Sequence, residues 1–141
     1  MIRRIRCIAI LAAVASLALT GLAQAKPVSL APSTGKANTV FKLTLVGQKV
    51  QNAQNNSEYL QADLVAPAGA DDECSVHQGF SYQSTGAGAK RKVVFTLDPN
   101  ELYSQYWCKG TWKVKVVAVN TDEESGSPIK TPVASASFRV R

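Results

Sequence analysis

Side chains that could support catalysis are few in this 141-residue sequence. His77 is the single histidine, so a metal site built from several histidines is excluded. A Ser-His-Asp arrangement could combine His77 with Asp71, Asp72 or Asp98, but no segment resembles the nucleophile elbow of such hydrolases. A lone histidine on a strand is usually a surface or packed residue. The sequence therefore predicts a protein that is not an enzyme, and it indicates no cofactor.

Two acidic clusters offer the oxygen ligands that calcium prefers. The clusters are Asp71-Asp72-Glu73 and Asp122-Glu123-Glu124, and they could share one ion if their loops met at one end of the protein. Neither cluster has the alternating spacing of a dedicated calcium loop, and solvated loop acids are the simpler interpretation. No metal site is predicted.

Aromatic residues are densest between positions 103 and 112. Trp112 shares the parity of the valines that follow it and is predicted to lie in the core. Tyr103, Tyr106 and Trp107 flank Cys108 in an irregular stretch, where aromatic rings either cover a disulfide or form a platform for a sugar, peptide or protein partner. Covering the disulfide is the simpler interpretation because a small domain needs apolar burial. The alternative makes these three side chains a candidate binding surface.

A second candidate surface is basic. Lys113, Lys115, Arg139 and Arg141 are expected on the outward face of two neighbouring strands. Such a strip could meet an anionic envelope polymer, lipid headgroups or an acidic protein. Lysines on exposed strand faces also keep sheets soluble, which is the simpler explanation.

The first 25 residues have the three parts of a secretory signal peptide. Three arginines stand among the first six residues, an apolar stretch covers residues 7–19, and residues 23–25 read Ala-Gln-Ala, a small-x-small cleavage site. We expect Sec-type export, cleavage after Ala25, and one secreted or periplasmic domain over residues 26–141. An uncleaved N-terminal anchor is the alternative, and it is the only membrane contact that the sequence indicates.

Removal of the signal would change both the charge and the cysteine count. It leaves 13 basic residues against 10 acidic ones, a net charge of +3 in place of +6, which is too small to indicate nucleic-acid binding. Cys7 also leaves, so that Cys74 and Cys108 remain, and an even count in an oxidising compartment predicts one disulfide. The pair lacks Cys-x-x-Cys spacing, so we expect a structural bridge.

Two-residue alternation of apolar and polar side chains recurs along residues 26–141 and predicts β-strands. Seven strands are expected, over residues 28–30, 38–46, 58–65, 75–83, 90–97, 111–119 and 133–140. Polar loops are expected over residues 47–57 and 120–132. Asp98 as N-cap, Pro99 at the first helical position and Glu101 three residues after the cap predict a short helix over residues 99–106. The fold class expected is an all-β, two-layer antiparallel sandwich with one short helical turn, preceded by the signal-peptide helix.

Two segments resemble the bacterial immunoglobulin-like β-sandwich superfamily, whose members serve as binding, adhesive or structural modules. Residues 32–35 (Pro-Ser-Thr-Gly) followed by residues 41–45 (Phe-Lys-Leu-Thr-Leu) are similar to the turn into the second strand. Residues 110–116 (Gly-Thr-Trp-Lys-Val-Lys-Val) resemble the sixth strand. The resemblance implies a seven-stranded immunoglobulin-like sandwich and carries over no functional residue.

The immunoglobulin bridge joins the second and sixth strands, whereas Cys74 follows the third expected strand. The Cys74–Cys108 bridge is therefore predicted to tie a loop to the segment after the helical turn. The function expected is an exported, non-catalytic interaction or structural module whose partner is an unknown protein or envelope polymer. A secreted enzyme inhibitor acting through residues 120–132, and a small-ligand or carbohydrate-binding protein, are the alternatives.

Overall fold

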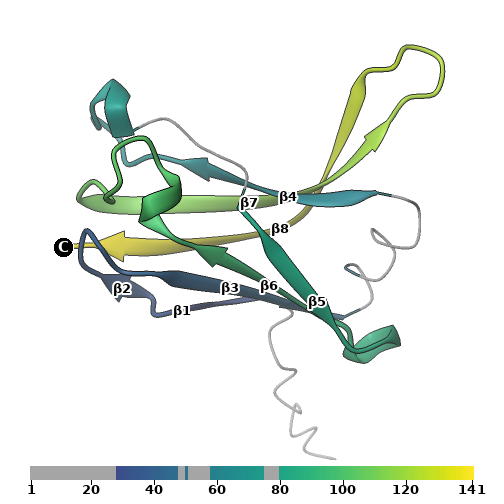
Figure 1. The fold of residues 1–141 in the computed structure, drawn as a ribbon, viewed down its shortest axis with the longest axis horizontal. Helices are drawn as coiled ribbons and strands as arrows, with labels where there is room; N and C mark the ends of the chain where they lie inside the picture. The colour runs from purple at the N-terminus through teal and green to yellow at the C-terminus, as the bar shows by residue number, and fades with distance from the viewer. Residues whose placement is uncertain (1–27, 48–49, 51–57, 75–79) are drawn as a thin grey trace, which may run out of the picture.

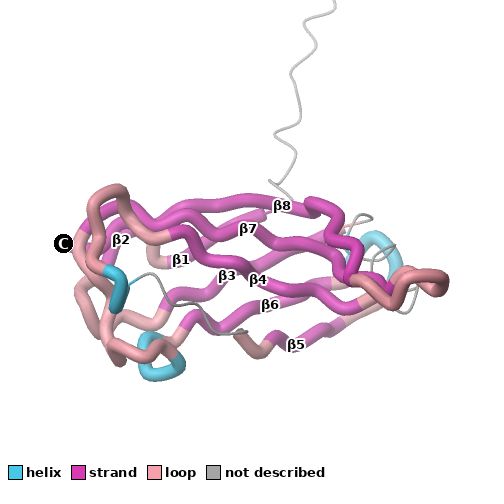
Figure 2. The backbone as a smooth tube through the Cα atoms, turned by 90° about the horizontal axis from the view of Figure 1, so that it is seen from above, coloured by secondary structure: helices cyan, strands magenta, loops and turns pink. Residues whose placement is uncertain are grey.

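The computed structural model describes residues 28–47, 50, 58–74 and 80–141, which form two four-stranded β-sheets stacked as layers (Figures 1 and 2). One sheet has the strand order β1 (Val28–Ala31), β3 (Phe41–Val46), β6 (Lys92–Leu97), β5 (Tyr82–Thr85). The other has the order β2 (Thr34–Gly35), β8 (Pro128–Val140), β7 (Gly110–Thr121), β4 (Tyr59–Val65). The all-β prediction is confirmed. The predicted signal peptide, residues 1–25, lies outside the described residues.

Three short 3-10 turns connect the strands: η1 (Asp72–Cys74), η2 (Gly88–Lys90) and η3 (Pro99–Glu101). None of the helices in the described residues is long and apolar enough to cross a bilayer. Both η1 and η3 lie at the end of the sandwich where the chain terminates, whereas η2 lies at the other end (Figure 1). The loops that carry η1 and η3 are therefore available to build one site.

The core lies between the sheets and follows the predicted alternation. Strands β3, β6 and β7 each place every second side chain inward, and these side chains are at most 1% exposed: Phe41, Leu43, Leu45, Val93, Phe95, Leu97, Trp112, Val114 and Val116. Burying one such side chain stabilises a fold by about 1.5–3 kcal/mol. The predicted core position of Trp112 is confirmed.

The strands of the two sheets are more numerous than predicted and are not all antiparallel. The described residues form eight strands, and β2 pairs in parallel with β8, with Thr34 opposite Arg139. The neighbouring backbone continues this pairing, because Arg139 N donates to Ser33 O (3.0 Å) and Arg141 N donates to Gly35 O (3.0 Å). A strand of two residues has no alternation to detect, which is why the sequence predicted seven antiparallel strands.

The predicted loop over residues 120–132 is instead a hairpin arm. Strand β7 continues to Thr121 and β8 begins at Pro128, with Val119 opposite Lys130 and Asn120 opposite Ile129. A register shift between Val116 and Val117 marks the base of the arm, and the hairpin projects beyond the body of the sandwich (Figure 1). Residues 120–132 are exposed except for the partly buried Asp122, so this part of the hairpin lacks the buried face that produces alternation. We call residues 117–132 the hairpin arm.

The predicted helix over residues 99–106 is shorter than expected. Asp98 caps it as predicted, since its Oδ1 accepts a hydrogen bond from Asn100 N at 2.9 Å, but only one turn follows, Pro99–Glu101. Leu102 leaves the helical conformation with ψ 154° and its side chain is buried. Burial of Leu102 turns the chain into the core and ends the helix. The predicted strand over 75–83 lies in part outside the described residues, and β5 runs from Tyr82 to Thr85.

Candidate functional site

A surface groove of about 650 Å³ lies between η1 and the loop that follows η3. Its lining combines two acidic side chains from η1 with two tyrosines and a serine from the loop: Asp72, Glu73, Tyr103, Ser104 and Tyr106. We call it the tyrosine–acid groove, Asp72 and Glu73 its acid wall, and residues 103–106 its tyrosine wall. The two walls come from segments about 30 residues apart in the chain, so only the fold brings them together.

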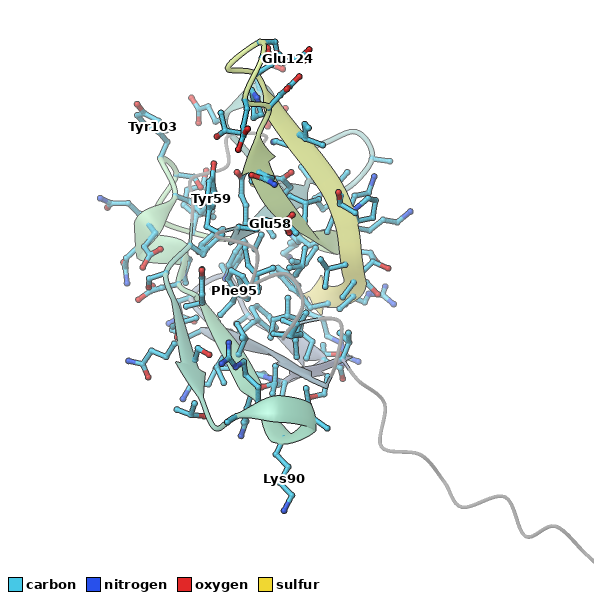
Figure 3. All side chains as sticks on the ribbon, turned by 90° about the vertical axis from the view of Figure 1, so that its right-hand side faces the viewer. Glu58, Tyr59, Lys90, Phe95, Tyr103 and Glu124 are labelled. Atoms are coloured by element: carbon cyan, nitrogen blue, oxygen red, sulfur yellow. A yellow bond between two sulfur atoms is a disulfide. The ribbon has the colours of Figure 1, made fainter. Side chains whose placement is uncertain are left out.

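The tyrosine wall is an exposed loop held at both ends by buried side chains. Leu102 and Trp107 are 5% and 1% exposed, whereas Tyr103 and Tyr106 between them are 76% and 47% exposed. Figure 3 shows the Tyr103 side chain extending away from the sheets. The rings are thus presented to solvent from a fixed base.

Hydrogen bonds inside the loop fix its shape. Ser104 Oγ donates to Tyr106 O (2.7 Å), and Gln105 N donates to Leu102 O (3.1 Å). Gln105 has a left-handed backbone with φ +58°, which costs a residue other than glycine about 1–2 kcal/mol. The surrounding contacts therefore maintain a turn that the isolated chain would disfavour.

Trp107 belongs to the core, which corrects its assignment to the candidate binding surface. Its ring centroid lies 5.0 Å from Phe138, 5.1 Å from Trp112 and 5.9 Å from Phe41. Its indole Nε1 donates to Thr39 O at 2.8 Å. Its backbone N donates to Ala37 O, in the turn before β3, also at 2.8 Å. Trp107 therefore attaches the tyrosine wall to the core and to the turn before β3.

The segment that carries the acid wall is attached by a disulfide and by close packing of the Pro67 ring against the backbone of Gly110. Cys74, directly after Glu73, is bonded to Cys108, with 6.1 Å between the Cα atoms, so the predicted bridge and its loop-to-loop connection are confirmed. Nearby, Gly110 has φ +125°, and a Cβ at this position would lie 2.6 Å from Cβ of Pro67. Only glycine permits this approach. The two segments that carry the walls are therefore joined twice.

The two acidic clusters do not meet. Residues 71–73 lie at the end of the sandwich that carries η1, and Asp122, Glu123 and Glu124 lie at the tip of the hairpin arm at the other end (Figures 1 and 3). The alternative of one calcium ion shared by both clusters is therefore wrong. Across residues 28–47, 50, 58–74 and 80–141, no three His, Cys, Asp or Glu side chains gather in a way that could hold a metal ion.

Asp122 organises the turn of the arm, and we predict that its titration reports this role. Its Oδ1 accepts from Glu124 N (3.1 Å) and its Oδ2 from Ser125 Oγ (2.9 Å), and these bonds lower the pKa of the Asp122 carboxyl below its ordinary value of 3.8. A lowered carboxyl pKa stabilises the turn above the unfolded-state pKa, and this stabilisation is lost as pH falls through the folded-state value. Carbon-detected NMR should give a midpoint below 3.8, and Ser125→Ala should raise it. A wild-type midpoint at or above the ordinary value would contradict this role.

The basic side chains lie on a separate, flat surface. Lys113, Lys115 and Arg139 are exposed on the outward face of the β7–β8 pair, where their register partners are Ser137, Ser135 and Thr111. On its other side Lys115 lies opposite Asp63 of β4, which also forms an ion pair with Lys130 (3.6 Å). Asp63 therefore offsets part of the positive charge of this face. Arg141 is exposed beyond the end of β8.

Sequence reasoning found Tyr103 and Tyr106 but missed the acid wall. The sequence indicates Asp72 and Glu73 only as possible calcium ligands, and Asp72 also as a possible carboxylate of a Ser-His-Asp arrangement. The bridge offered a signal, because Glu73 precedes Cys74 directly and Tyr106 stands two residues before Cys108. His77 lies outside the described residues.

Comparison with known proteins gives no assignment. No protein-family model matches the sequence. A search of curated proteins finds no significant match.

Proposed function

We propose that the protein is an exported, non-catalytic interaction module with an immunoglobulin-like fold, which binds a partner through the tyrosine–acid groove. The signal-like N-terminus and the Cys74–Cys108 bridge both support export, since disulfides persist in oxidising compartments. The strand order supports the immunoglobulin-like fold, and the exposed tyrosines of the groove support the binding of a partner.

The strand order supports the immunoglobulin-like assignment. Immunoglobulin constant-type domains place strands A, B, E and D in one sheet and C, F and G in the other. With β2 treated as a short extension of the first strand, β1-β3-β6-β5 corresponds to A-B-E-D, and β4-β7-β8 corresponds to C-F-G. The bridge departs from that family's inter-sheet disulfide because Cys74 lies in η1.

The exposure of two ordered tyrosines in a groove is the observation that carries the binding proposal. Tyrosine supplies a large, rigid contact area at low entropic cost and is enriched among the residues that dominate binding energy. Leu102 and Trp107 fix the loop before any partner arrives, so little ordering entropy remains to oppose binding. The Ser104 hydroxyl donates its hydrogen to Tyr106 O, a bond that orders the loop and does not activate a nucleophile.

We expect the double variant Tyr103→Ala/Tyr106→Ala to lose partner binding while the fold remains intact. Truncating residues that dominate an interface weakens binding by about 30-fold or more. The measurement is quantitative capture of partners from envelope and culture-medium fractions by the wild type and the variant. Tyr59→Ala is the matched control, because Tyr59 is 54% exposed on β4 and does not line the groove.

Equal capture by wild type and double variant would exclude the groove as the binding site. It would favour the second candidate, a secreted enzyme inhibitor acting through the hairpin arm, which the projection of the hairpin in Figure 1 supports. Replacing Glu123 and Glu124 at the arm tip with serine would then reduce capture. The same substitutions should leave binding through the groove unchanged.

A further inference from the structure

We infer that the tyrosine–acid groove accepts a lysine or arginine side chain of a protein partner. This inference rests on the proposed function and names the chemical class of its ligand. Three observations carry it: the chemistry of the two walls, the charge around them, and their fixed spacing.

The two walls offer complementary contacts to a cation. Tyr103 and Tyr106 present aromatic rings, whose faces attract ammonium and guanidinium groups. Asp72 and Glu73 present exposed carboxylates, with which lysine and arginine form charge-assisted hydrogen bonds. Among the described residues of the lining, both charged side chains are acidic, so they would repel an anionic ligand.

The two segments that carry the walls are acidic, although the protein as a whole is basic. The segments over residues 66–74 and 98–110 contain one basic residue, Lys109, against five acidic ones: Asp71, Asp72, Glu73, Asp98 and Glu101. The whole chain has 16 basic and 10 acidic residues. A local negative potential of this kind steers cations toward the site and does not favour a neutral sugar.

Both walls are attached to the rest of the protein, which favours insertion of one side chain between them over contact with a broad surface of the partner. The disulfide and the contact between Gly110 and Pro67 hold the acid wall, and Trp107 holds the tyrosine wall. A cation bound in the groove would contact tyrosine side chains from one wall and carboxylates from the other. Preorganised sites of this type lose less free energy to ordering when they bind.

The test compares two peptides that differ only in charge, acetyl-Gly-Ser-Arg-Ser-Gly-amide and its citrulline analogue. Each is titrated into ¹⁵N-labelled protein with the disulfide intact, and amide shifts are followed at residues 72–73 and 103–106. We expect the arginine peptide to shift these amides and the citrulline peptide to bind about five- to tenfold more weakly. Added salt should weaken only the arginine peptide.

Charge-neutralising variants give the matched control. Asp72→Asn/Glu73→Gln should reduce the affinity for the arginine peptide and bring it closer to that for the citrulline peptide, the remaining difference coming from the tyrosine rings. Glu123→Gln/Glu124→Gln removes the same charge from the tip of the hairpin arm and should leave both affinities unchanged. An unchanged arginine affinity in the groove variant would overturn the inference.

Three further outcomes would also overturn it. These are equal affinities for the two peptides, no amide shift at the groove at millimolar arginine peptide, and shifts of the same amides by an N-acetylglucosamine tetramer but not by the peptide. The last outcome would assign the groove to carbohydrate. None of them removes the proposed function, which the capture experiment with Tyr103→Ala/Tyr106→Ala tests separately.

Discussion

Replacing Trp107 with alanine is expected to lower the free energy of unfolding by about 3–5 kcal/mol. The indole is 1% exposed and contacts the rings of Phe41, Trp112 and Phe138, so truncation leaves a large cavity at the end of the core. Small domains are stable by only about 5–15 kcal/mol in total, so the variant should unfold at much lower urea concentration. Urea denaturation followed by circular dichroism measures the change.

The conservative variant Trp107→Phe separates packing from hydrogen bonding. Phenylalanine keeps most ring contacts but lacks the Nε1 donor, which leaves Thr39 O without the 2.8 Å bond it accepts. We expect a loss of about 0.5–1.5 kcal/mol, the net contribution of a hydrogen bond whose acceptor residue is only partly buried. If Trp107→Ala instead unfolded at the same urea concentration as the wild type, the core position of the indole would be wrong.

Burial of both tryptophans also changes how ligand binding is detected. A carbohydrate-binding protein with a surface tryptophan would show quenching of its fluorescence by the ligand. Trp107 and Trp112 are each 1% exposed, so a ligand in the tyrosine–acid groove cannot contact either indole directly. The groove has to be monitored through its tyrosines or its backbone amides.

Strands with one buried face were predictable because the pattern and the packing have the same cause. In β3, β6 and β7 every second residue enters the core, and the sequence shows this as alternation. The start of β3 was placed too early, at residue 38 instead of Phe41. A turn occupies residues 36–39, in which Thr39 Oγ1 accepts from Lys36 N (2.8 Å) and Thr39 N donates to Lys36 O (3.1 Å).

The site was less predictable because its geometry depends on contacts between distant residues. Whether Trp107 points inward is decided by bonds to Ala37 and Thr39, about 70 residues earlier, and no local pattern encodes them. The hairpin arm was missed for a different reason, since its backbone pairs as a ladder while most of its side chains stay in solvent. Alternation of apolar and polar residues arises where one face of a strand is buried, so two paired strands that are exposed on both faces do not show it.

Removing the Cys74–Cys108 bridge is the second change with a large expected effect. The bridge joins residues 34 apart in the sequence. Closing a loop of this size restricts the unfolded chain and stabilises the folded state by about 4 kcal/mol. We expect Cys74→Ser/Cys108→Ser to lower the free energy of unfolding by about this amount, measured by urea denaturation against the oxidised wild type.

Two controls separate the cross-link from the chemistry of the substituted residues. Reducing the wild type with dithiothreitol breaks the bridge without adding a new side chain. Cys74→Ala/Cys108→Ala avoids placing a hydroxyl at Cys74, which is 6% exposed. All three should lose a similar amount of stability. Loss confined to the serine variant would show that a buried hydroxyl, and not the missing bridge, causes it.

The bridge should also matter to the groove more than to the sheets. The backbone hydrogen bonds that hold residues 67–74 are local. Ala70 N donates to Pro67 O (3.1 Å) and Cys74 N donates to Asp71 O (2.9 Å). Local turns of this kind do not attach the acid wall to the β-sheets, so the disulfide is its only covalent cross-link, beside the packing of Pro67 against Gly110 of β7. In a bridge-free protein that is still folded, amide shifts should therefore change at Asp72 and Glu73 and remain small in β3 and β6.

Changes at Trp107 and at the Cys74–Cys108 bridge should consequently act on opposite walls of the groove. Trp107→Phe weakens the attachment of the tyrosine wall, and loss of the bridge weakens that of the acid wall, which keeps the packing of Pro67 against Gly110. Under conditions where both variants stay folded, each should weaken partner binding although neither removes a side chain of the groove lining. Unchanged binding in the bridge-free protein would mean that the partner contacts the tyrosine wall alone, because the attachment of that wall through Trp107 does not depend on the bridge.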